Sequence, residues 1–310
     1  MKRILTYALL TLAVVLIGLG VWLYTPDKSR NDLEAKYAGA PSLFVEAAGV
    51  RLHIRDTGPK AAPALVLLHG FGMSLHTWEG WAKLLEPDFR VVRLDLPGFG
   101  LTGIDPTGDY TDARMLTVIA ALMDKLNIRR ASIAGNSMGG RFAWAFAAKY
   151  PARVDKLILI SPDGFASLGL AYGKRASVPS VVKLMQYALP KSMLKSSLAP
   201  AYAERTRLSE DVVTRYHDLM LVPGVRGAII ARMEQLVLED PVPLLKSIKA
   251  PTLLVWGAKD AMIPLSHAAD YQQVLPDNAL VTFPNLGHVP HEEDPAQSLA
   301  PVRAFLDKNG

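Results

Sequence analysis

The chain has 310 residues, of which half are hydrophobic, with a formal net charge of +5 and no cysteine. This length allows one large core or two modest ones, and the lack of cysteine excludes disulfides and thiolate metal sites. The seven histidines show no HExxH or similar ligand spacing, and the basic residues form no blocks typical of nucleic-acid binders. We therefore expect no metal, no cofactor and no nucleic-acid partner.

Residues 4–24 form an uncharged apolar run that follows two basic residues. As a helix the run would span about 30 Å, which matches the hydrocarbon core of a bilayer. Trp22 and Tyr24 stand where an interfacial aromatic belt forms. We predict a single-pass anchor in the bacterial inner membrane, with the following chain in the periplasm. The alternative is secretion after cleavage of a signal peptide near residues 18–20. The polar residues 25–41 are predicted to be a tether.

From residue 42 onward, short β-branched runs alternate with turns and helical patterns, which is typical of an α/β sheet. A β-hairpin is expected first. Continuous apolar runs then indicate strands that are covered on both faces, and a helix is predicted over 111–126. The predicted strands are 43–46, 50–55, 64–68, 91–94, 131–134, 156–160, 252–256 and 279–283.

Residues 164–243 interrupt this alternation with a helical pattern that contains no buried strand. We predict a helical cap inserted after the sixth strand, with the core formed by 42–163 and 244–310; a separate domain beside the core is the alternative. One apolar stripe falls at 181–189, and a second helix begins behind a Ser209 cap. The basic residues of the cap are expected to be a solvated face, with contact to anionic lipid headgroups as the alternative.

Residues 135–139, Gly-Asn-Ser-Met-Gly, stand between the strand predicted at 131–134 and a Pro-free run at 140–150 that is expected to be helical. A turn this tight has no room for side chains at its two glycines, and it holds the serine in a strained conformation that exposes Oγ. The next backbone N–H, on Met138, points from a helix N-terminus toward an oxygen that gains negative charge. Ser137 is therefore predicted to be a catalytic nucleophile.

A serine nucleophile needs a base and an orienting acid at strand ends on the same sheet edge. The loop after the strand at 252–256 carries Asp260 as its first carboxylate, and the loop after the last strand carries His288 as its first histidine. The chain order serine, aspartate, histidine fits this architecture. We predict Asp260 as the acid and His288 as the base, with Asp163 and His291 as the alternatives.

The segment His-Gly-Phe-Gly at 69–72 follows the strand at 64–68, at the edge where a second oxyanion donor is needed. Its glycines allow the backbone to turn so that the N–H of Phe71 can join that of Met138. The predicted oxyanion hole consists of these two N–H groups, and an ordinary glycine turn is the alternative.

From about residue 42 to the C-terminus, the chain resembles an α/β-hydrolase-fold enzyme, and it is similar to bacterial lipases, esterases and meta-cleavage-product hydrolases that share a Gly-Asn-Ser-Met-Gly-Gly elbow. The resemblance implies a triad of Ser137, Asp260 and His288, an oxyanion hole from Phe71 and Met138, and no cofactor. It is carried by the segments at 69–72, 95–100 (Asp-Leu-Pro-Gly-Phe-Gly), 135–140, 256–260 and 287–288.

Two features narrow the reaction that the resemblance implies. Haloalkane dehalogenases and epoxide hydrolases place an aspartate at the position of Ser137, which argues against both reactions. Meta-cleavage hydrolases usually carry a tryptophan directly after the catalytic histidine, where this chain has Val289. We expect hydrolysis of a small-molecule carboxylic ester (esterase or lipase activity) through an acyl-enzyme, with an apolar acyl pocket supplied by the cap. The alternatives are carbon–carbon or thioester hydrolysis with the same triad, and a non-catalytic ligand-binding role.

Overall fold

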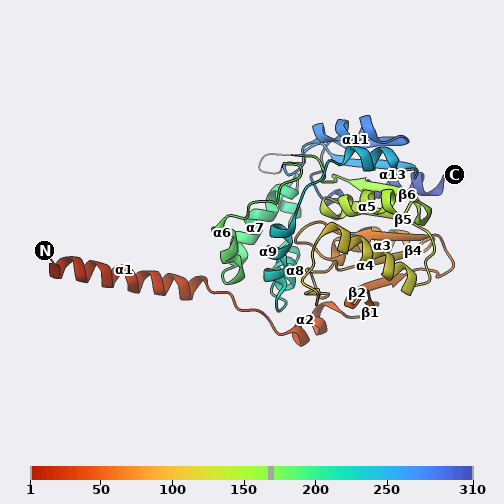
Figure 1. The fold of residues 1–310 in the computed structure, drawn as a ribbon. Helices are drawn as coiled ribbons and strands as arrows, with labels where there is room; N and C mark the ends of the chain where they lie inside the picture. Colours follow the sequence, from red (N-terminus) through yellow and green to blue (C-terminus); the bar gives the residue numbers. More distant parts are fainter. Residues whose placement is uncertain (1, 167–170, 309–310) are drawn as a thin grey trace.

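The computed structural model describes residues 2–166 and 171–308, and its centre is an eight-stranded sheet (Figure 1). The strands are β1 (Ser42–Ala47), β2 (Val50–Thr57), β3 (Ala64–Leu68), β4 (Arg90–Leu94), β5 (Ala131–Asn136), β6 (Val154–Ile160), β7 (Thr252–Gly257) and β8 (Asn278–Phe283). Their spatial order is β1-β2-β4-β3-β5-β6-β7-β8. The β1–β2 hairpin and the β2–β4 pair are antiparallel, and the other neighbours are parallel. The predicted hairpin and mostly parallel sheet are confirmed.

Helices cover both faces of the sheet, because both faces are apolar and must be shielded from water. The core helices are α3 (Glu79–Leu85), α4 (Asp112–Lys125), α5 (Met138–Lys149), α11 (Ala268–Val274), α12 (Pro290–Glu293) and α13 (Pro295–Asp307). On one face α3 and α13 bury Trp81 and Val302 against the strands. On the other face α4 and α5 bury Val118 and Phe146. The carboxyl ends of the parallel strands remain free to carry the loops of a site.

The chain leaves the sheet after β6 and returns to it at β7, and the helices between these strands form the cap (Figure 1). They are α6 (Ser180–Lys183), η3 (Leu184–Gln186), α7 (Lys191–Leu198), η4 (Ala199–Ala201), η5 (Arg205–Arg207), α8 (Glu210–Met220), α9 (Val225–Gln235) and α10 (Val242–Ser247). The predicted N-cap of α8 is present, because Ser209 Oγ accepts a hydrogen bond from the N–H of Val212 at 3.2 Å. The helical insertion after the sixth strand is confirmed.

The apolar stripe predicted at 181–189 does not lie on one continuous helix. Prolines 179 and 190 bound this stretch, and proline cannot continue a helix, so only the single turn α6 and the 3₁₀ turn η3 form between them. Leu189 is buried, whereas Val181 and Leu184 are mostly exposed. Part of the stripe therefore forms an apolar surface instead of core.

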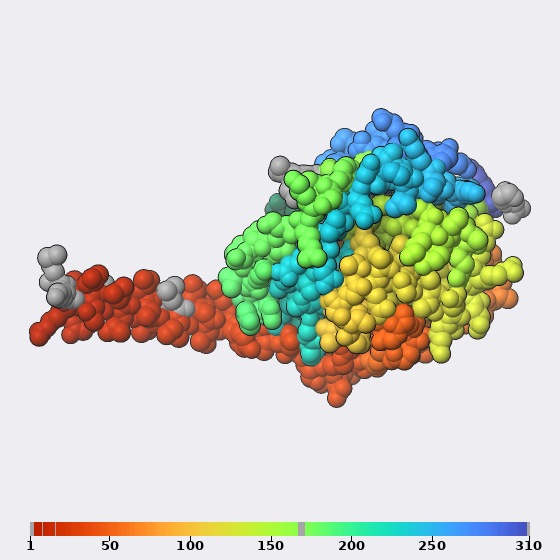
Figure 2. Space-filling model, viewed as in Figure 1, coloured from red at the N-terminus to blue at the C-terminus, as the bar shows by residue number. Residues whose placement is uncertain are grey.

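The helix α1 (Lys2–Leu23) stands away from the body of the molecule (Figures 1 and 2). Among the described residues it is the one helix that is long and apolar enough to cross a membrane. An N-terminal signal sequence can meet the same criteria of length and composition.

The segment after α1, predicted as a tether over 25–41, is docked onto the cap. It contains the helix α2 (Arg30–Tyr37), whose Leu33 is buried. The N–H of Thr25 donates to the carbonyl of Tyr187 at 2.8 Å. Local polarity indicated a free segment, but these cap contacts are long-range and hold it in place.

Candidate active site

Ser137 lies at the junction of β5 and α5, with φ 54° and ψ −120°. A positive φ is strained for a residue with a Cβ, and it persists only where the surroundings hold it. The Ser137 N–H donates to the carbonyl of Ile160 at 3.0 Å. The Ser137 carbonyl accepts hydrogen bonds from the N–H groups of Arg141 (3.1 Å) and Asp163 (3.2 Å). The serine itself is partly exposed, so this strained turn presents a hydroxyl that is not sealed in the core.

The two glycines of the turn allow backbone to pack directly against backbone. A Cβ added to Gly135 would lie 2.1 Å from the carbonyl oxygen of Gly139. A Cβ added to Gly139 would lie 2.2 Å from the carbonyl oxygen of Leu68, the last residue of β3. Backbone atoms cannot swing aside as side-chain ends can. The start of α5 is thus held against the loop at 69–72.

Gly135→Ala is expected to destabilise the fold by about 3 kcal/mol or more, because the added methyl group overlaps backbone that cannot yield. Gly227→Ala is the matched control, since a Cβ on that α9 glycine meets nothing within 4 Å. The control is expected to stabilise the protein by about 0.5–1 kcal/mol through helix propensity. Thermal unfolding of both variants checks the prediction, and equal midpoints would contradict it.

The structure brings the predicted acid and base together. His288 Nδ1 lies 2.8 Å from Asp260 Oδ2, and both side chains are buried. The other carboxylate oxygen, Oδ1, accepts hydrogen bonds from the N–H groups of Met262 and Ile263, each at 2.8 Å. With Nδ1–H donating to the carboxylate, Nε2 is left as the proton acceptor. The acid is held on both sides and orients the ring.

The residue before the serine joins the nucleophile loop to the histidine loop. Asn136 Nδ2 donates to the carbonyl of His288 at 2.9 Å and to the carbonyl of Ile160 at 3.2 Å. Ile160 also accepts from the N–H of Ser137, so β6 and the two loops share one network. The three predicted residues therefore come from strand ends that are bonded to one another on one sheet edge.

The two alternative residues have other partners. The His291 ring stacks on Trp78, with 4.0 Å between ring centroids, and its Nε2 lies 3.0 Å from Thr77 Oγ1. Burial lowers the pKa of His291 to about 3, so this ring stays neutral. Asp163 Oδ1 forms an ion pair with Arg141 Nε at 3.2 Å. Neither residue takes part in the hydrogen bond between Asp260 and His288.

The loop at 69–72 approaches the serine from β3. A Cβ on Gly70 would lie 3.4 Å from Ser137 Cβ, so this loop forms the wall of the site. His69 holds its shape: Nδ1 donates to the carbonyl of Gly70 at 2.8 Å, and Nε2 accepts from the N–H of Leu96 at 3.0 Å. Burial lowers the pKa of His69, which keeps this neutral tautomer. Phe71 follows Gly70 in this wall.

Phe71 and Met138 are the two predicted oxyanion donors. The Phe71 side chain is partly exposed and meets Phe99 edge to face, with 5.7 Å between centroids. Met138 is the first residue of α5, and first-turn N–H groups have no partner within the helix. Both predicted residues therefore flank the serine, one in the adjacent loop and one in the adjacent helix.

Glu293, in α12, clamps the histidine loop to the cap. Its Oε2 accepts a hydrogen bond from the N–H of Gly287 at 2.7 Å, and its Oε1 accepts from the N–H of Ala203 at 3.0 Å. The N–H of His288 donates to the carbonyl of Ala201 at 2.8 Å. One buried carboxylate thus connects the residue before the base with the cap segment that packs on it. These contacts predict that Glu293 positions His288.

Glu293→Gln is expected to lower kcat for a soluble ester about tenfold or more, with KM little changed, because an amide cannot accept from every N–H that the carboxylate serves. Glu292→Gln is the matched control. Glu292 binds the cap through Tyr202, Tyr216 and Arg215. This control is expected to lower the unfolding temperature without the same loss of kcat. A loss of equal size in both variants would contradict the positioning role.

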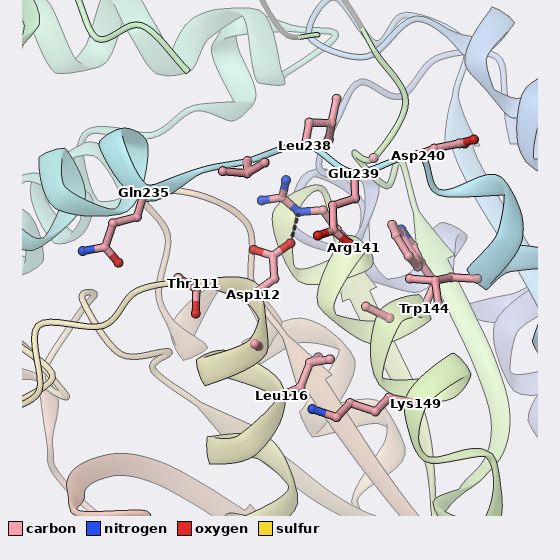
Figure 3. A pocket seen from close by; sticks show the side chains of 15 residues that line it. Thr111, Asp112, Leu116, Arg141, Trp144, Lys149, Gln235, Leu238, Glu239 and Asp240 are labelled. Atoms are coloured by element: carbon pink, nitrogen blue, oxygen red, sulfur yellow. Dashed lines mark ion pairs between the residues drawn. The ribbon is translucent and has the colours of Figure 1, made fainter. Parts of the chain in front are cut away.

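A cleft of about 340 Å³ runs beside α5, between the core and the end of the cap (Figure 3). Arg141 lies at its centre and pairs with Asp112, with 3.3 Å between Nε and Oδ2. A second cavity of about 90 Å³ shares Arg141 and reaches Asp163 and Ile263 beside the Asp260 loop. The larger cleft is lined by Thr111, Asp112, Ala113, Leu116, Arg141, Trp144, Ala145, Lys149, Gly164, Gln235, Val237, Leu238, Glu239, Asp240 and Leu244. The lining mixes apolar and charged side chains from core and cap.

Sequence patterns did not indicate the roles of Asn136 and Glu293. Asn136 directly precedes the nucleophile, and this position was the available signal. Glu293 stands in a Glu-Glu-Asp run that reads as the acidic first turn of a helix, so no local pattern singles it out. Across residues 2–166 and 171–308, no group of three or more potential metal-ligating side chains occurs.

The similarity of this chain to known proteins extends over most of its length. A family model described as alpha/beta hydrolase fold matches residues 63–295. A 2-hydroxy-6-oxononadienedioate/2-hydroxy-6-oxononatrienedioate hydrolase from Comamonas testosteroni is 30% identical over 249 residues, which are 77% of this chain and 85% of that protein.

Two solved structures are similar in fold and length. A membrane phospholipase A, described as a bacterial virulence factor, has a TM-score of 0.70 and 27% identity, and the match covers 99% of this chain and 98% of that one. A thermophilic esterase from Thermogutta terrifontis has a TM-score of 0.71 and 25% identity, covering 86% and 98%. The match to the phospholipase extends through the N-terminal helix.

Proposed function

The chain belongs to the α/β-hydrolase family, and on this premise we propose that it is a membrane-anchored serine hydrolase that cleaves carboxylic esters with apolar acyl groups. The observation that carries the proposal is the buried pair of His288 and Asp260, 2.8 Å apart. The loop of His288 is hydrogen-bonded to Asn136, in the strained turn of Ser137. Such an arrangement is the acid–base partner that a weak serine nucleophile requires. No step of the proposed reaction uses a cofactor.

The proposed reaction has two halves. Ser137 Oγ attacks the ester carbonyl carbon while His288 Nε2 accepts the hydroxyl proton, and Asp260 stabilises the resulting imidazolium. The carbonyl oxygen becomes an oxyanion that the N–H groups of Phe71 and Met138 stabilise. His288 then protonates the leaving alcohol as the carbon–oxygen bond breaks. Water, deprotonated by the same ring, then attacks the acyl carbon. The bond to Ser137 Oγ breaks, His288 returns the proton to Oγ, and the carboxylic acid is released.

Several observations favour esters of membrane lipids as the substrate class. The membrane phospholipase A matches the chain over 99% of its length, and the thermophilic esterase shares the fold. The apolar α1 supports an anchor that keeps the domain at a lipid surface. We propose that α1 crosses the inner membrane once with the catalytic domain in the periplasm; the alternative is secretion after cleavage.

Carbon–carbon hydrolysis is the second candidate, because the Comamonas testosteroni hydrolase of a 2-hydroxy-6-oxo dienedioate is 30% identical. The residue after His288 argues against it, since Val289 stands where tryptophan is usual in meta-cleavage hydrolases. Val289 is completely buried.

Substrate competition tests the proposal. We expect the full-length protein in detergent micelles to hydrolyse p-nitrophenyl esters from acetate to palmitate, and to release fatty acid from phosphatidylcholine. Its kcat/KM for a vinylogous 2-hydroxy-6-oxo dienoate is expected to be lower than that for the best ester. Faster turnover of the dienoate would replace the ester assignment by carbon–carbon hydrolysis, and no turnover of any of these compounds would indicate a binding role.

A further inference from the structure

The cap carries an exposed apolar face that its own fold leaves uncovered. Val181 is 71% exposed, Leu184 57% and Tyr187 58%, and their spacing of three residues places them on one side of the α6–η3 turns. We call these three residues the cap patch. Met193, on the next helix, is also mostly exposed. Contiguous apolar surface of this kind marks a contact with a protein or a membrane.

The cap patch lies where the proposed anchor enters the folded domain, because α1 ends at Leu23 and Thr25 is already hydrogen-bonded to the patch segment. The N–H of Thr25 donates to the carbonyl of Tyr187 at 2.8 Å, and Thr25 Oγ1 accepts from the N–H of Leu189 at 3.1 Å. Figures 1 and 2 show α6 and α7 on the side of the body that faces α1. Trp22, at the end of α1, is exposed as an interfacial aromatic would be.

Buried charges fix this arrangement. Asp218 of α8 is only 2% exposed and accepts hydrogen bonds from Lys28 Nζ (2.6 Å), Lys36 Nζ (2.8 Å) and Tyr37 OH (2.7 Å). All three partners come from the segment that follows α1. Separating them would leave a buried carboxylate unpaired, which is strongly unfavourable. The domain therefore cannot swing freely about the end of α1, and the cap patch stays on the α1 side.

The lysines near the patch already have partners. Lys183 pairs with Glu234 at 2.5 Å, and Lys191 and Lys195 pair with Glu210. Contact with a lipid surface at this place would depend on burial of apolar side chains more than on attraction to anionic headgroups.

We propose that the cap patch lies in the interfacial region of the same bilayer that α1 crosses, so that the cap rests on the lipid surface beside the site. This inference rests on the proposed anchoring of α1. The surface that the cap patch contacts is a phospholipid bilayer. A membrane-spanning α1 ends at Leu23, two residues before Thr25 contacts the cap, and this brings the patch to the level of the headgroups.

The absence of cysteine allows a direct test with single labels on the full-length protein. Leu184→Cys, labelled with bimane, is reconstituted in phosphatidylcholine vesicles with and without brominated acyl chains. We expect a blue-shifted emission and quenching by the brominated lipid, unchanged in 0.5 M NaCl. Leu84→Cys is the matched control, because Leu84 is a 43% exposed leucine on α3 of the core. The control label is expected to show neither effect.

Flotation with the vesicles separates the failure of this inference from that of the anchor. Protein that floats while the label at 184 behaves like the label at 84 would overturn the patch contact alone. Protein that does not float would contradict the anchor and this inference together.

Activity gives a second readout. Leu184→Asp is expected to lower fatty-acid release from vesicles about tenfold or more, and to leave hydrolysis of soluble p-nitrophenyl butyrate unchanged. Unchanged release from vesicles would also overturn the inference. Lack of butyrate hydrolysis by the unsubstituted protein would contradict the proposed reaction and leave the label result standing.

Discussion

Ser137→Ala is expected to lower kcat/KM for p-nitrophenyl butyrate by at least about 10⁴-fold, because the acyl-enzyme cannot form without Oγ. The variant should also lose labelling by a fluorophosphonate, which reacts with activated serines. The fold should be retained, since the hydrogen bonds that hold this turn use the backbone of Ser137.

Ser161→Ala is the matched control for this prediction. Ser161 is a second serine at positive φ, 41°, at the end of the neighbouring strand β6, and it is completely buried. We expect its loss to leave ester hydrolysis within a few-fold of the unsubstituted protein. Residual activity of Ser137→Ala above about 1% would show that another group is the nucleophile.

Asp260→Asn is expected to lower kcat by about 10⁴-fold with little change in KM. The asparagine can still accept the N–H bonds of Met262 and Ile263, so the loop should keep its shape. Its amide, however, cannot both orient the ring of His288 and stabilise the imidazolium, and it favours the wrong tautomer. Steady-state kinetics on a soluble ester, with the unfolding temperature as a check of the fold, measures the effect.

Asp163→Asn tests the alternative acid in the same assay. Asp163 forms an ion pair with Arg141 and no hydrogen bond with His288, so its replacement should keep kcat within about tenfold while lowering stability. A large loss of kcat in Asp163→Asn combined with a small loss in Asp260→Asn would reverse the assignment of the acid.

Much of the fold and of the candidate site could be predicted from local patterns. Continuous apolar runs identify strands that are covered on both faces. The run at 64–68, for example, coincides with the observed β3. The tight turn around Ser137 can be predicted from the sequence, because a side chain at either of its two glycines would overlap nearby backbone. The candidate acid and base were found because each is the first titratable residue of its type after a predicted strand.

Other features depend on residues that are far apart in the chain. The sequence predicts His288 over His291 only by its place as the first histidine of the loop. The burial of His291 against Trp78, which occupies the rival ring, is not visible locally. The clamp by Glu293 joins α12 to a cap segment about 90 residues earlier. Such pairs have no periodicity or spacing, so no sequence pattern reveals them.

The two regions where the structure differs from the sequence expectation have the same origin. The polar segment 25–41 is predicted to be a free tether, but the buried Asp218 of the cap accepts hydrogen bonds from its Lys28 and Lys36. Residues 181–189 are predicted to carry a helical stripe, but the prolines at 179 and 190 shorten the helix and leave part of the stripe exposed. In both cases a distant partner, or the lack of one, overrides the local preference.

By itself, the sequence determined the α/β class, the strands, the position of the cap and the strained serine turn, because these depend on hydrophobic periodicity and on steric limits within a few residues. The tertiary structure alone decided which backbone groups hold the acid in place, which carboxylate holds the histidine loop, and which apolar side chains stay on the surface. These outcomes depend on burial and on hydrogen-bond partners supplied by strands and loops that only folding brings together.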